Sequence, residues 1–122
     1  MRALIPDTNF LIYLVKYRLL DELEKENFKI ITIKQIIDEL NKIEKKKTAK
    51  VKDKVAASIA KEFLNSKAIL EVQEGETDDA IITLAKRFKA TVGTMDKELT
   101  KKAKKEKIKI IKIRQKKYLI EE

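Results

Sequence analysis

Five acidic side chains in this sequence occupy positions where they could do chemistry: Asp7, Glu39, Asp78, Asp79 and Asp96. Asp7 and Asp96 directly follow apolar runs that read as strands, whereas the other three lie at the start of a predicted helix or inside one. Carboxylates held close together repel, so at least one would stay protonated near neutral pH without a compensating charge. A divalent cation supplies that charge, and carboxylate oxygens with open water positions suit metal-assisted phosphodiester hydrolysis.

Short apolar runs alternate with helical patterns along the whole chain and would bring these acids together. The runs predict strands at residues 3–5, 28–31, 68–72, 91–95 and 108–113. Apolar residues at helical spacing predict helices at residues 8–24, 33–43, 55–64, 78–88 and 97–105, with a charged stretch at 44–52. We therefore expect one α/β domain over residues 1–122, a three-layer sandwich with a parallel sheet of about five strands. Such sheets place ligands at the carboxyl ends of their strands.

The composition excludes several classes of site and indicates a polyanionic partner. The chain of 122 residues has no Cys, His or Trp, so disulfides, zinc fingers, Ser-His-Asp triads and imidazole ligands are ruled out. Any metal would sit on oxygen ligands, which suits Mg²⁺, Mn²⁺ or Ca²⁺. The net charge of +9 favours nucleic acid over a membrane surface. A composition rich in Lys, Glu and Ile is also typical of life at high temperature.

The location of the chain in the cell is predicted from its apolar segments. No stretch approaches the roughly 20 apolar residues that a membrane span needs. Arg2 and Asp7 bring charge too early for a signal peptide. We expect a cytoplasmic protein without a membrane partner.

Each acid also has a purely structural interpretation. Asp7 and Asp96 are good N-caps for the helices that follow them, and acids at 78 and 79 favour the first turn of any helix through its macrodipole. Glu39 alone would be an ordinary surface residue of a charged helix. Each position by itself is weak, and the order and placement of all of them is the stronger signal.

Four segments carry a family resemblance. Residues 5–12 contain Asp-Thr-Asn after a hydrophobic run, residues 36–40 contain Asp-Glu in a helix, residues 77–82 contain Thr-Asp-Asp before an apolar run, and residues 93–99 contain Thr-Met-Asp before a short helix. In this order and spacing the chain resembles a PIN-domain ribonuclease over essentially its whole length.

The resemblance implies a Mg²⁺- or Mn²⁺-dependent endoribonuclease acting on RNA. By position, the catalytic and metal-binding acids would be Asp7, Glu39, Asp79 and Asp96. Asp79 is preferred to Asp78 because it directly precedes the apolar run 80–82, which leaves Asp78 as an auxiliary acid. Asn9 and Thr94 would be supporting polar groups that orient ligands or water.

Two roles within the family fit, and one rival activity stays open. The tail, residues 108–119, is more similar to archaeal relatives of rRNA-processing proteins, which would work with ribosome-assembly proteins. The other role is a VapC-type toxin whose antitoxin blocks the site, and a homodimer is expected in either case. The rival is a non-catalytic RNA-binding module using the basic clusters 45–47 and 101–107. A phosphoacceptor receiver domain fits poorly, because Asp7 has no paired acid.

Overall fold

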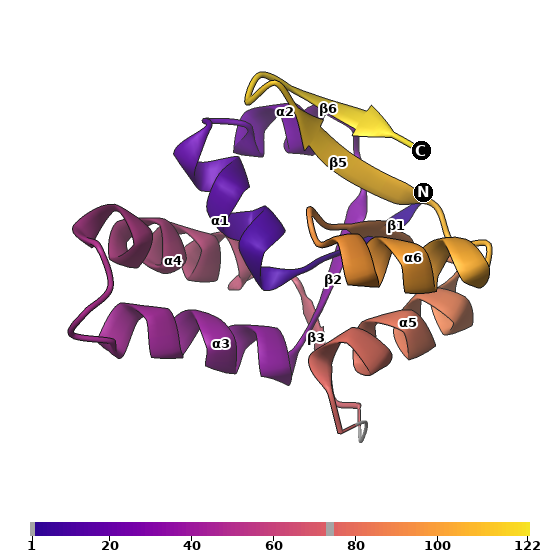
Figure 1. Ribbon diagram of the computed structural model, residues 1–122, viewed down its shortest axis with the longest axis horizontal. Coiled ribbons are helices and arrows are strands. Elements are labelled where there is room, and N and C mark those ends of the chain that lie inside the picture. Colours follow the sequence, from indigo (N-terminus) through magenta and orange to yellow (C-terminus); the bar gives the residue numbers. More distant parts are fainter. Residues whose placement is uncertain (1, 73–74) are drawn as a thin grey trace.

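The protein is an α/β sandwich built on one six-stranded sheet, as a computed structural model of residues 2–72 and 75–122 shows (Figure 1). The strands are β1 (Ala3–Pro6), β2 (Lys29–Ile33), β3 (Ala68–Leu70), β4 (Thr91–Gly93), β5 (Ile110–Arg114) and β6 (Tyr118–Glu121). Their order is β3-β2-β1-β4-β5-β6, and all neighbours are parallel except β5 and β6. The predicted fold class, a three-layer α/β sandwich, is confirmed.

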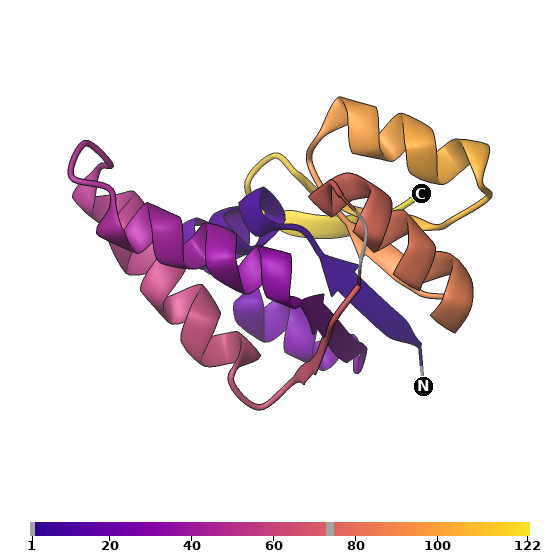
Figure 2. The same ribbon diagram turned by 90° about the horizontal axis from the view of Figure 1, so that it is seen from below.

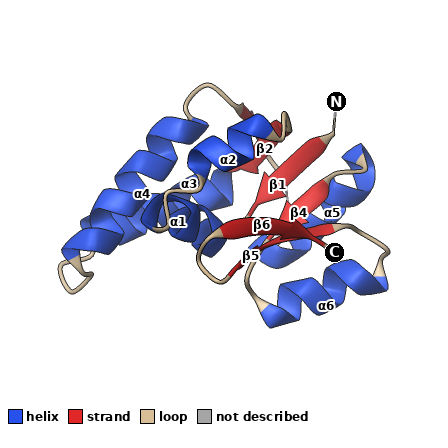
Figure 3. Cartoon of the chain, turned by 90° about the horizontal axis from the view of Figure 1, so that it is seen from above, coloured by secondary structure: helices blue, strands red, loops and turns tan. Residues whose placement is uncertain are grey.

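Two groups of helices flank this sheet (Figure 2). The helices are α1 (Thr8–Lys16), α2 (Leu20–Lys25), α3 (Lys34–Lys45), α4 (Val51–Leu64), α5 (Thr77–Phe88) and α6 (Lys97–Lys105). Helices α1, α3 and α4 pack against one another, while α5 packs against α6, β1 and β4. Figure 3 shows the first group to one side of the strands and the second to the other. No helix in the described ranges is long and apolar enough to cross a membrane.

Parallel pairing brings the ends of distant segments to one edge of the sheet. Pro6, the last residue of β1, is in register with Gly93, the last residue of β4. The backbone N–H of Asp7 continues this ladder by donating to the carbonyl oxygen of Gly93 at 2.8 Å. Residues just after β1 and β4 therefore lie side by side at the carboxyl edge of the sheet.

The contact between β4 and α1 requires a glycine. Phe10 of α1 is fully buried, and its ring lies over Gly93. A Cβ atom at position 93 would stand 2.6 Å from Cε2 of Phe10, closer than real atoms pack. The absence of a side chain at position 93 therefore sets how closely α1 approaches the end of β4, and with it the place where Asp7 sits.

Two of the predicted elements were wrong. The single helix expected at residues 8–24 is two helices, because Arg18 adopts a left-handed conformation (φ 58°) that breaks the chain after α1. A sixth strand, β6, pairs antiparallel with β5 where only a tail was expected. Its turn has φ of 55° at Gln115 and 58° at Lys116, a geometry that Asn-Gly usually marks.

Several boundaries also differ from the predicted ones. The strand expected at 68–72 ends at Leu70, the one at 91–95 ends at Gly93, and the last strand begins at Ile110. The charged stretch 44–52 contains the end of α3 and the start of α4, joined by the short segment 46–50. Charged side chains there stay exposed on the helices, which weakens the apolar pattern from which helices are predicted.

Candidate acidic metal site

Asp7 is the most buried acid of the site, with 8% of its surface exposed. It is the N-cap of α1, and its Oδ1 accepts the backbone N–H of Phe10 at 2.8 Å. Its Oδ2 accepts the hydroxyl hydrogen of Thr94. Burial raises the pKa of Asp7 to about 6, against the lowering effect of these two hydrogen bonds and with a further rise from Asp78 and Asp96.

Thr94 connects Asp7 to the next acid. It is fully buried just after β4, and besides donating to Asp7 its Oγ1 accepts the backbone N–H of Asp96 at 3.0 Å. Asp96 itself is exposed and caps α6, since its Oδ1 accepts the backbone N–H of Leu99 at 2.9 Å. One hydroxyl thus ties the two strand-end segments together. The predicted role of Thr94 in orienting ligands or water stays a prediction.

Glu39 enters from the second turn of α3 and is half-buried. The hydroxyl of Thr8 donates to its Oε2 at 3.2 Å. Its Oε1 is buried without a hydrogen-bond partner among the residues that the structure describes. An unpaired buried carboxylate oxygen costs free energy, and a cation next to it would remove that cost. The orienting role of Thr8 was not predicted, although its place in the Asp-Thr-Asn segment was the available signal.

Asp78 and Asp79, in the first turn of α5, have different surroundings. Burial raises the pKa of Asp78, and so do the charges of Asp96, Asp79 and Glu39, while Lys102 lowers it. Asp79 is exposed, and its Oδ1 lies 3.6 Å from Nζ of Lys102 on α6. The structure therefore sets Asp78 in the shared electrostatic field of the acids, and it sets Asp79 against a lysine of the neighbouring helix.

Asn9 lines a pocket that none of the five candidate acids lines. It is exposed in the first turn of α1 and lines a pocket of about 310 Å³ together with Lys46 and Asp53. It forms no hydrogen bond with an acid within the described ranges. Its predicted role in orienting ligands therefore has no contact to support it.

The residues present fit a hard cation held largely by water. Within residues 2–72 and 75–122, no three carboxylates come close enough to form a ready-made cage. Mg²⁺ does not require one, because it keeps several waters and binds through one or two carboxylates plus substrate phosphates. The raised pKa of Asp7 and the unpaired Oε1 of Glu39 both mark places where a positive charge would be stabilised.

Comparison with known proteins places this chain in a family. The model of the PIN-like domain matches residues 4–116. The chain is 33% identical over 124 residues to Ribonuclease VapC4 of Methanocaldococcus jannaschii, covering 97% of this chain and 95% of that protein. It is also 33% identical over 107 residues to Ribonuclease VapC9 of Archaeoglobus fulgidus, covering 85% of this chain and 77% of that protein. The chain belongs to the PIN-like domain family.

A solved structure supports the fold independently. A domain of a functionally unknown protein from Methanocaldococcus jannaschii superimposes with a TM-score of 0.65, covering 93% of this chain and 91% of that one. The two are 17% identical in sequence, so this likeness concerns the fold alone.

Proposed function

We propose that this protein is a metal-dependent endoribonuclease that hydrolyses RNA phosphodiester bonds at the acidic edge of its sheet. The observation that carries the proposal is the buried, unpaired Oε1 of Glu39. The charge of Glu39 raises the pKa of Asp78, and the charges of Asp78 and Asp96 raise the pKa of Asp7. The two relatives named as ribonucleases and the match to the PIN-like domain support the reaction class.

The chain's own residues prepare the site. Asp7 is held at both carboxylate oxygens, by Phe10 and Thr94, so its orientation is fixed before any ligand arrives. Thr8 orients Glu39 in the same way. Groups fixed in this manner need no reorganisation during the reaction. Such preorganisation accounts for much of the rate enhancement that an electrostatic site provides.

Mg²⁺ or Mn²⁺ is the proposed cofactor, held largely by water and by one or two carboxylates from the set Asp7, Glu39, Asp78 and Asp96. The chemistry that such a cation supplies is activation of water and neutralisation of charge on the phosphate. We assign Asp78 rather than Asp79 to this set, because it is the acid of the pair that raises the pKa of Asp7. Asp79 pairs with Lys102 and contributes to the position of α6.

RNA cleavage with and without divalent cation tests the proposal. Wild-type protein should cut single-stranded or structured RNA with Mn²⁺ and stop on addition of EDTA. Glu39→Gln should lower the rate at least about a hundredfold. Asp38→Asn, which changes the exposed neighbour on the same helix, is the matched control and should cut like wild type. Cleavage that survives EDTA, or equal loss in both variants, would contradict the proposal.

Of the two cellular roles, we favour the VapC-type toxin, because both curated relatives carry that name. The sequence alone had favoured the rRNA-processing group. A toxin role carries with it a protein antitoxin that blocks the site, and a homodimer stays a prediction. Induced expression in a bacterial host separates the roles: a toxin arrests growth and its Glu39→Gln variant does not, whereas an rRNA-maturation enzyme leaves growth unaffected.

A further inference from the structure

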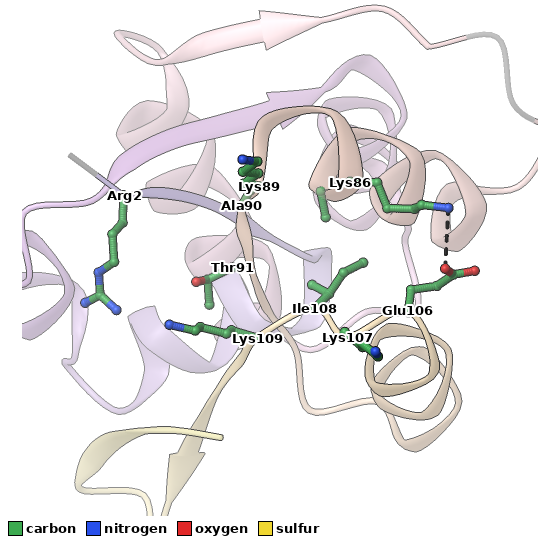
Figure 4. Close-up of a pocket in the computed structure, with 10 residues that line it drawn as sticks. Arg2, Lys86, Lys89, Ala90, Thr91, Glu106, Lys107, Ile108 and Lys109 are labelled. Atoms are coloured by element: carbon green, nitrogen blue, oxygen red, sulfur yellow. Dashed lines mark ion pairs between the residues drawn. The ribbon is translucent and has the colours of Figure 1, made fainter.

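A polar pocket lies at the opposite edge of the sheet from the acids (Figure 4). It has a volume of about 530 Å³ and lies by the amino ends of β1, β4 and β5. Its charged lining residues are Arg2, Lys86, Lys89, Glu106, Lys107 and Lys109. Five of the six are cationic, so the pocket carries a strong local excess of positive charge.

Three of these five cations have no counter-charge among the residues that the structure describes. Lys86 lies 3.4 Å from Glu106, and Arg2 lies 2.6 Å from Glu121. Lys89, Lys107 and Lys109 form no ion pair with any residue of the described ranges. Like charges gathered around one concavity repel one another, and an anion bound there would relieve that repulsion.

The arrangement of the three lysines suits a chain of phosphates better than a single one. Figure 4 shows Lys89, Lys107 and Lys109 on different sides of the pocket, without convergence on one point. Side chains of Ala85, Ala90, Thr91 and Ile108 complete the lining, which contains no aromatic ring. Base stacking therefore has no platform here, and contacts to a nucleic acid would go to its backbone.

The two edges of the sheet are joined by two helices. Helix α5 begins at Thr77, has Asp78 and Asp79 in its first turn, and ends just before Lys89. Helix α6 begins after Asp96 and ends at Lys105, two residues before Lys107. With 12 and 9 residues, these helices are about 18 and 14 Å long at 1.5 Å per residue. One RNA strand is long enough to contact both edges.

We propose that this pocket, defined by Lys89, Lys107 and Lys109, is a non-catalytic site for the phosphate backbone of RNA, one helix length from the acids. The proposal rests on the proposed ribonuclease function for the choice of RNA. Binding there is independent of base sequence and of divalent cation, and it anchors the substrate away from the bond that is cut.

Binding measured without catalysis tests this site. Fluorescence anisotropy of a labelled single-stranded RNA is followed in EDTA over a series of salt concentrations. The test variant is Lys89→Gln/Lys107→Gln/Lys109→Gln. The matched control is Lys50→Gln/Lys52→Gln/Lys54→Gln, which removes the same charge at the start of α4. Thermal unfolding confirms that both variants are folded.

The expected result is a weaker dependence of RNA affinity on salt concentration in the test variant. Each lost phosphate contact lowers the slope of log K against log salt by about 0.7 for single strands, so the test variant should lose about 2. Its affinity at moderate salt should fall at least about tenfold, with little change in the control. Equal weakening in both variants, or no RNA binding by wild type, would overturn the proposal. So would full displacement of RNA by millimolar inorganic phosphate at constant ionic strength, since that marks a site for a single free anion.

Failure of this proposal is distinguishable from failure of the proposed function. The binding experiment contains no divalent cation, whereas the function is judged by cleavage in Mn²⁺. If the wild-type protein cuts RNA and the test variant binds RNA like the control, the proposed RNA-binding pocket is contradicted and the proposed nuclease function stands. If the wild-type protein never cuts RNA and only the test variant loses RNA binding, the proposed nuclease function is contradicted and the proposed RNA-binding pocket stands.

Discussion

Thr94 donates its hydroxyl hydrogen to Oδ2 of Asp7, 87 residues earlier in the chain, and accepts the backbone N–H of Asp96 through the same oxygen. One buried side chain thus fixes the carboxylate at the end of β1 and the segment that follows β4. Neither acid is placed by its own element alone, and this shared contact makes the carboxyl edge of the sheet a single polar unit.

Replacing Thr94 should change the ionisation of Asp7. The Thr94 hydrogen bond lowers the pKa of Asp7, so Thr94→Val should raise that pKa further above about 6. Mn²⁺ binding requires the deprotonated carboxylate. The acidic limit of binding, which is the pH below which Mn²⁺ no longer binds, should therefore move to higher pH. Isothermal titration calorimetry at several pH values measures the limit. Thr94→Ser retains the hydroxyl and should behave like wild type, and an unchanged limit in Thr94→Val would refute the coupling.

Asp7 should make the metal-free protein less stable as pH rises. Its pKa is about 6 in the folded state against 3.8 when unperturbed, so the folded protein binds the extra proton between these values. Stability from this group is therefore full below about pH 4 and lost as pH rises through 6. The loss is on the order of 2–3 kcal/mol.

Asp7→Asn should remove that dependence. In EDTA, its free energy of unfolding by urea should vary less between pH 4 and pH 6 than that of wild type. The variant should be the more stable of the two near neutral pH, and RNA cleavage should be lost. The contradicting result is a wild-type free energy of unfolding that rises between pH 4 and pH 6 relative to that of Asp7→Asn. It would show that burial does not raise the pKa of Asp7 in the folded protein.

Gly93 should tolerate no side chain. Gly93→Ala places a Cβ 2.6 Å from the buried ring of Phe10, and overpacking of this kind costs about 1–3 kcal/mol. Gly75→Ala is the matched control, because a Cβ there meets nothing within 4 Å. Urea unfolding compares the two variants. Equal stability of Gly93→Ala and wild type would mean that α1 can move away from β4 at no cost.

The two acids of α5 should separate in activity. Asp78→Asn should lower Mn²⁺-dependent cleavage about a hundredfold or more, because it removes a charge from the shared field of the acids. Asp79→Asn should retain most of the activity, since it breaks only an exposed pair with Lys102. Single-turnover cleavage rates measure both. The reverse order would assign the metal to Asp79, as the sequence resemblance implies.

Strands β1 to β5, and the positions of Asp7 and Asp96 shortly after two of them, could be predicted from the sequence because apolar runs are a strong local signal. Apolar runs ending in Asp7 and Asp96 place those acids at strand ends whatever the rest of the chain does. The choice between Asp78 and Asp79 has no such signal. Adjacent residues on a helix differ in direction by about 100°, and only the packing of α5 beside α6 decides which one faces the other acids.

The break after α1 and the turn into β6 were not predicted, because both use left-handed backbone conformations at residues other than glycine. Arg18 ends α1, and Gln115 and Lys116 make the turn into β6, all with positive φ. With two glycines in 122 residues, left-handed positions fall on Arg, Asn, Gln and Lys. Turn prediction relies on Gly and Asn, and it therefore fails in a sequence of this composition.

Binding of Mn²⁺ to wild type and to Asp7→Asn, measured by calorimetry near neutral pH, tests the central claim most directly. The account predicts that wild type binds the ion, that binding weakens as pH falls through about 6, and that Asp7→Asn loses most of the affinity while remaining folded. Equal Mn²⁺ affinity in the two proteins would contradict it, because the acidic edge of the sheet would then not be the metal site.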